Sequence, residues 1–141
     1  MKSDKSTIKW LSRAYWLKIK IEKLQSHRAE MQAMAEGVKS MDYGKIHAQG
    51  GERPTLADAA LGLIELDHRI ADAIMKFTRT VDEITETINK VEDERLSTIL
   101  YLRYVKGEKW EQICVVIHYE WAQTHRLHHL AVEEVKKIRE R

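Results

Sequence analysis

An arginine and three histidines lie close together near the carboxyl end of the chain, at Arg126, His125, His128 and His129. Imidazoles three or four residues apart on a helix can bind one metal ion. No cysteine-rich or carboxylate-rich signature accompanies them, so a metal site is the less favoured interpretation. No nucleophile has a base at a recognisable spacing, and the acidic residues are spread as helix-surface charges. We therefore expect no enzyme activity, no catalytic residue, no metal and no cofactor.

The composition fits a folded chain without a disulfide or a membrane span. Cys114 is the only cysteine among the 141 residues, which excludes an internal disulfide. No apolar run approaches the roughly 20 residues that cross a bilayer, and the amino-terminal residues are polar rather than signal-like. We expect a cytoplasmic protein with no membrane contact.

Charge is distributed unevenly along the chain. Residues 1–50 carry ten positive and five negative side chains, and residues 51–106 carry eight positive and eleven negative ones. Residues 107–141 carry six of each. The opposite charges of the first two segments indicate either that these segments pair or that each has an ordinary solvated face.

Two apolar stripes predict two long helices. The first runs from about Ser6 to Val38, with Arg28 in its one polar gap, and the second follows a capping pair at Thr55 and Asp58. The glycines between about residues 39 and 54 predict a loop. Residues 1–91 are thus expected to form an antiparallel hairpin or coiled-coil arm, paired within one chain or between two copies. The stripe positions are Trp10, Ala14, Leu17, Ile21, Leu24, Met31, Ala35 and Val38, then Leu56, Ala60, Leu63, Leu66, Ile70, Ile74, Phe77, Val81, Ile84, Ile88 and Val91.

Residues 92–141 have the pattern of a helix-turn-helix in an all-α chain. Asp93 can cap a helix that reaches Lys106, and Gly107 can end it in the left-handed conformation. A short helix over 110–117, a turn at His118 and Tyr119, and a last helix from about Glu120 should follow. The small side chain of Cys114 is predicted to face the last helix, whose buried residues should be Thr124, Leu127, Ala131, Val135 and Ile138.

The segment LYLRYVKGEKWEQICVVIHYEWAQTHRLHHLAVEEV, residues 100–135, resembles region 4 of sigma-70-type factors. With its Trp-Glu-x-Ile motif at 110–113 and its His-Arg-Leu-His motif at 125–128, the chain also resembles a family of phage and prophage proteins from Gram-positive bacteria. That family is similar to ArpU/RinA-type late-gene transcription regulators. The resemblance implies double-stranded DNA as a partner, contact with RNA polymerase as an option, and a bacterial host cell as the location.

The resemblance also implies which residues contact DNA. The start of the last helix would enter the major groove, with Arg126 as the best candidate to bind guanine O6 and N7. Two lysines beside the short helix would hold phosphates. A solvated surface is the alternative for all of them, and Trp121 can equally cap the core. The residues expected at the DNA are Trp121, Ala122, Gln123, His125, Arg126 and His129, with Lys106 and Lys109 at phosphates.

Three features depart from the family pattern. His118 stands in the turn where a glycine is usual, and Glu120 stands where a Ser or Thr cap is expected. The last 35 residues have no net charge, whereas a DNA-binding domain usually has a basic patch. Two functions follow: a phage-type transcription regulator, expected to dimerise through its long helices, or a helical adaptor that binds another protein through the arm.

Overall fold

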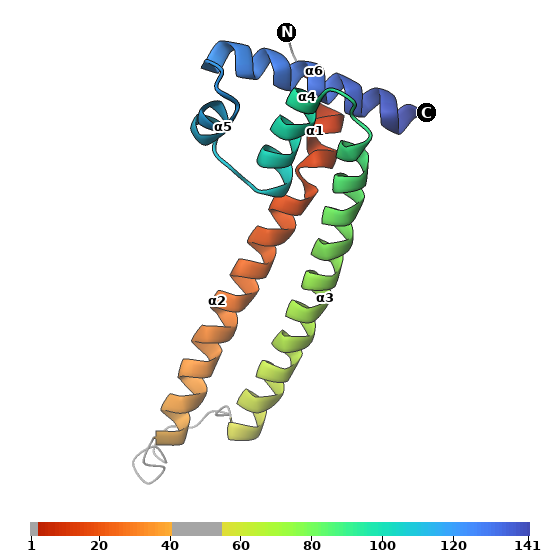
Figure 1. Cartoon of the computed structure of the whole chain (residues 1–141). Helices are drawn as coiled ribbons and strands as arrows, with labels where there is room; N and C mark the ends of the chain where they lie inside the picture. The colour runs from red at the N-terminus through yellow and green to blue at the C-terminus, as the bar shows by residue number, and fades with distance from the viewer. Residues whose placement is uncertain (1–2, 41–54) are drawn as a thin grey trace. The chain divides into compact units, whose positions relative to one another are not determined.

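The computed structural model describes residues 3–40 and 55–141, and every regular element in these ranges is helical (Figure 1). The chain is therefore all-α, as its sequence predicts. The predicted loop residues 41–54 and the side chain of Val38 lie outside the described part. The elements are α1 (Lys5–Leu11), α2 (Arg13–Ser40), α3 (Leu56–Asn89), α4 (Glu94–Leu100), the π-helical turn η2 (Tyr101–Val105), α5 (Trp110–Ile117) and α6 (Trp121–Glu140).

Local hydrogen bonds explain where three of the helices begin. Asp4 caps α1 by accepting from the Thr7 backbone N–H at 3.1 Å. The predicted pair at α3 is present, because Thr55 Oγ1 accepts from the Asp58 N–H and Asp58 Oδ2 accepts from the Thr55 N–H, each at 3.1 Å. Asp93 caps α4 through the Arg95 N–H at 2.9 Å, as predicted.

The first predicted helix is interrupted at Ser12, which separates α1 from α2. The guanidinium of Arg13 donates from Nε to the Trp10 carbonyl at 2.9 Å. A side chain thus binds a carbonyl that a regular helix would offer to a backbone N–H four residues later. The prediction of one continuous helix was wrong at this turn because the sequence pattern does not reveal such a side-chain contact.

The last turn before Gly107 is also irregular. The Lys106 N–H bonds to the carbonyl of Tyr101, five residues back, at 3.0 Å. Gly107 then ends the helix with φ 71°, the left-handed conformation that the sequence predicts there. Tyr104 of this turn lies inside the core, where it is 8% exposed.

The described chain forms two compact units: a terminal unit, Met1–Lys18 with Lys76–Arg141, and a hairpin unit, Ile19–Met75. This division differs from the predicted boundary at residue 91. The reason is that α1 and the end of α3 share one hydrophobic core with α4, α5 and α6. The buried members of this core are Leu11, Ala14, Ile84, Ile88, Val91, Leu96, Ile99, Leu100, Tyr104, Ile113, Leu127, Ala131, Val132 and Val135.

Within the hairpin unit, α2 and α3 run side by side in opposite directions (Figure 1). Arg28, in the polar gap of the first stripe, pairs with Asp67 of α3 through both Nε and Nη2. This hydrogen bond lowers the pKa of the Asp67 carboxyl. Because both side chains are partly exposed, we expect the pair to fix the register more than to add stability.

The predicted stripe of α3 is only partly the buried face. Leu66 is buried, but Leu56 and Ile74 are 44% and 43% exposed, while Ala73 and Thr80 are buried instead. A straight α-helix has 3.6 residues per turn, so a strict seven-residue pattern drifts around its surface. None of the helices in the described ranges has both the length and the apolar content that a bilayer crossing requires.

The space around two glycines in the hairpin differs, and alanine substitutions there test how closely the two helices pack. A Cβ at Gly37 would meet nothing within 4 Å, whereas one at Gly62 would lie 2.6 Å from Met31 Cε. We expect Gly37→Ala to stabilise the chain by about 0.5–1 kcal/mol because alanine is the better helix former. Gly62→Ala should gain less, since the tip of Met31 must move. Urea unfolding followed by circular dichroism measures both, and equal gains would contradict the Met31–Gly62 contact.

Candidate nucleic-acid interface

Helices α5 and α6 are joined by a three-residue turn, His118, Tyr119 and Glu120. The bounds of α5 agree with the sequence prediction. His118 adopts the left-handed conformation, with φ 59° and ψ 38°, at the position where the resembled family has glycine. The Tyr119 N–H then bonds back to the Cys114 carbonyl at 3.3 Å. This is the backbone layout of two helices joined by a tight turn.

Cys114 and Thr124 form a polar contact between the two helices. The thiol of Cys114 donates to Thr124 Oγ1 at 3.3 Å. Thr124 is fully buried, and Cys114 is half-buried. The neighbouring Ile113 is fully buried in the core. A small side chain therefore faces α6 at the position where the sequence predicts one.

The first two turns of α6 expose part of the predicted DNA-contacting set. Trp121 is 53% exposed, and Ala122 and Arg126 are also exposed. Gln123 is half-buried, and its Oε1 accepts a hydrogen bond from Arg126 Nη1 at 2.8 Å. The buried face of the helix is instead made of Thr124, Leu127, His128, Ala131, Val132 and Val135.

Two predicted contact residues have partners within the chain. The ring of His125 lies between those of Trp110 and Trp121, with centroid distances of 4.6 and 4.5 Å. Its buried Nε2 has no hydrogen-bond partner among the described residues. His129 pairs through Nδ1 with Ser3 Oγ at 3.1 Å. The structure thus places Arg126 at the surface and these two half-buried histidines partly in packing contacts.

The two lysines lie on either side of the loop before α5. Lys106 follows η2, and Lys109 occupies the cap position of α5; both are exposed. Glu120 occupies the cap position of α6 but makes no side-chain capping bond there. Its carboxylate is therefore an exposed negative charge beside the amino end of α6.

A buried aromatic cluster lies beneath this surface, and the sequence pattern did not identify it. Tyr104 Oη and His128 Nε2 are 2.7 Å apart, and the edge of Trp110 meets the His128 ring at 4.7 Å. Arg103 covers the Trp110 ring at 4.8 Å. The one sequence signal was the three- and four-residue spacing that places His128 on the same face as Thr124 and Leu127.

Burial controls the protonation of this cluster. Burial is the main reason that the pKa of His128 falls to about 4. Electrostatic repulsion from His125, Arg103 and His129 lowers this pKa further. Burial also raises the pKa of the Tyr104 phenol to about 12. At neutral pH, a neutral imidazole therefore meets a neutral phenol, so their hydrogen bond buries no net charge.

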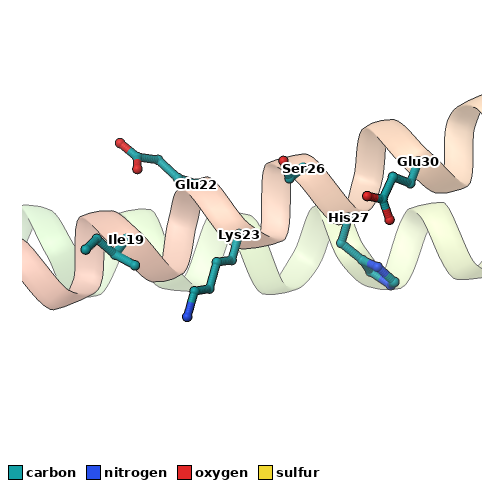
Figure 2. Close-up of a pocket in the computed structure, with 6 residues that line it drawn as sticks. All are labelled: Ile19, Glu22, Lys23, Ser26, His27 and Glu30. Carbon is teal, nitrogen blue, oxygen red and sulfur yellow. The ribbon is translucent and has the colours of Figure 1, made fainter.

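The shallow surface along α2 does not add a chemical site. Figure 2 shows the shallow surface along α2, where Glu22, Lys23, His27 and Glu30 point away from one another rather than toward a common centre. Over the described ranges, no three His, Cys, Asp or Glu side chains come together to hold a metal ion. No family model, no curated protein and no solved structure matches the chain.

The buried imidazole predicts acid sensitivity. The pKa of His128 lies below that of a histidine in the unfolded chain, so between about pH 6.5 and 4 the unfolded state binds a proton that the folded state does not. The contribution of neutral His128 to the free energy of unfolding should be fully present above this window. It should fall by about 3 kcal/mol as the pH drops through the window. His128→Gln should flatten the fall in the free energy of unfolding from urea titrations, whereas exposed His27→Gln should not. An unchanged slope in His128→Gln would contradict the buried neutral state.

The left-handed turn residue gives a second prediction. A β-carbon at φ 59° costs about 1 kcal/mol relative to glycine, reduced by the greater freedom of glycine in the unfolded chain. His118→Gly should therefore raise stability by about 0.5–1 kcal/mol. His118→Ala keeps the β-carbon and is the matched control. An equal gain in both variants, measured by thermal unfolding, would assign the effect to the imidazole and not to the backbone.

Proposed function

We propose that the chain is a phage-type transcription regulator that binds double-stranded DNA through α5 and α6. The observation that carries this proposal is the exposed start of α6, with Trp121, Ala122 and Arg126 presented after a three-residue turn. The Cys114–Thr124 contact holds the two helices together behind that surface. Such a helix start is the part of a helix-turn-helix that reaches base edges in the major groove.

Arg126 is the residue to which we assign base reading. A guanidinium can donate two hydrogen bonds to O6 and N7 of guanine. The bond to Gln123 orients the guanidinium in the free protein, which reduces the entropy lost when it binds a base. Ala122, exposed beside it, has the size and polarity to contact a thymine methyl group. Trp121 and its partner ring His125 would lie at the edge of this contact.

Electrostatics limit the strength of this DNA contact. Lys106 and Lys109 are exposed where they can reach phosphates, whereas Glu120 is exposed at the start of α6 and would repel them. With few phosphate contacts, a single copy should bind weakly and with a shallow dependence on salt. We therefore include in the proposal a homodimer formed through the long helices, or contact with RNA polymerase, as the source of additional affinity.

One observation favours the second function, a protein-binding adaptor. In the hairpin unit, Leu61, Ile64 and Met75 of α3 and Met34 of α2 are exposed, at 65%, 53%, 60% and 69%. Exposed apolar side chains at helical spacing are typical of a surface that another protein covers. In the first proposal, this partner is a second copy of the chain. In the second, it is a different protein, and the purified chain alone stays monomeric by sedimentation.

Selection from a random DNA pool tests the proposed DNA binding. The purified chain, at two salt concentrations, should enrich one motif, and higher salt should weaken the enrichment. Arg126→Ala should lose about 1–3 kcal/mol of binding to that motif and relax the preference at one base pair. Lys137→Ala, also exposed on α6 but three turns further on, is the charge control.

The outcomes separate the two functions. Circular dichroism should be unchanged in both variants because both side chains are exposed. Enrichment that persists in Arg126→Ala with the same base preference would remove Arg126 from the base-reading role. An absence of enrichment at either salt concentration would refute DNA reading by the isolated chain and favour the adaptor.

A further inference from the structure

A groove in the terminal unit is lined by residues that differ, apart from Lys109, from the proposed DNA contacts. Its volume is about 540 Å³, within the range of about 300–1,000 Å³ typical of small-molecule sites. Residues from α1, the first turn of α2, η2, α5 and α6 all line it. The proposed DNA contacts use only one of these lining residues, Lys109.

Aromatic rings form much of this groove. Tyr15 and Trp16 line it from the start of α2, with their ring centroids 5.2 Å apart in an edge-to-face arrangement. They are 53% and 64% exposed, a large apolar area to leave in water. The Tyr104–His128 pair and Trp110 also line the groove and are held in place by the core. Trp16 therefore presents an exposed ring on which a planar molecule can stack, in a groove whose other rings are held by the core.

The charge of the groove is positive. Arg103 and Lys109 line it, and none of the described lining residues is acidic. The Arg103 guanidinium is held over Trp110 and donates from Nη1 to the Glu108 carbonyl at 3.0 Å, so its position is fixed before any ligand arrives. Lys109 is exposed beside it. Cations next to aromatic faces, with Arg103 already held in place, favour a ligand that joins a flat ring to an anionic group.

We propose that this groove binds a small planar anion, a flat ring that bears one phosphate or carboxylate group. Trp16 stacks on the ring, and Arg103 and Lys109 bind the anionic group. Trp16 and Arg103 are not among the proposed DNA contacts, and Lys109 is the one residue that both proposals use. Binding therefore needs no DNA and is measured on the purified full chain.

Titration calorimetry with four probes tests the chemistry. AMP combines a ring with a phosphate, and indole-3-acetate combines a ring with a carboxylate. Adenosine has the ring without the charge, and ribose 5-phosphate has the charge without the ring. At least one of the first two should bind roughly tenfold more tightly than either of the last two. AMP alone would identify the phosphate as the group that is bound, and indole-3-acetate alone would identify the carboxylate.

Variants locate the binding at this groove. Trp16→Ala should weaken binding of the best probe roughly tenfold, because stacking on the ring is lost. Lys109→Gln should also weaken it and leave adenosine unaffected. Leu61→Ala and Lys137→Gln, exposed residues outside the groove, are the controls. Circular dichroism verifies that each variant is folded.

Three results would overturn the proposal: no binding of AMP or indole-3-acetate at millimolar concentration, equal binding of adenosine, or unchanged binding in Trp16→Ala. Arg126→Ala should bind the probe as the unaltered chain does. Probe binding in the groove would therefore stand even if the chain failed to bind DNA. DNA binding would likewise stand if no probe bound.

Discussion

Helix α6 supplies the apolar surface on which the terminal unit is assembled. Its six buried residues recur along one face, and α1, α4 and α5 all pack against this helix. Helices of seven or eight residues, such as α1, α4 and α5, are not stable alone in water. Their orientation is therefore set by side-chain packing on α6. The exposed start of α6 and the groove beside Trp110 both depend on this one packed face.

The amino-terminal residues belong to the same structural unit as the carboxyl-terminal ones. Trp10 lies between two guanidinium groups, with Arg13 at 4.7 Å and Arg139 at 4.3 Å from its ring centroid. Arg13 also pairs with Glu83 of α3 at 3.2 Å. Cation–π contacts and the buried Leu11 thus tie α1 to both α3 and α6. The pair α5 and α6 lacks its full core without residues that lie about a hundred positions earlier in the chain.

The features predicted best from the sequence are the helix starts and ends that depend on neighbouring residues. The caps at Thr55 and Asp93, the end at Gly107 and the bounds of α5 all follow from side chains within a few positions. Interactions between distant residues were not predictable from these local patterns. The Tyr104–His128 bond joins positions 24 residues apart, and the packing of His125 between two tryptophans needs the turn at His118 to be in place. Periodicity also located the apolar stripes without indicating that the end of α3 packs with the terminal unit rather than only with α2.

Cys114 is the only thiol in the chain and lies half-buried where α5 meets α6. Its rate of reaction with a thiol reagent should therefore rise when local opening separates the two helices. The same atom offers a single attachment point for a spectroscopic probe, without removal of any other cysteine. Labelling of Cys114 can therefore be used to measure motion between α5 and α6.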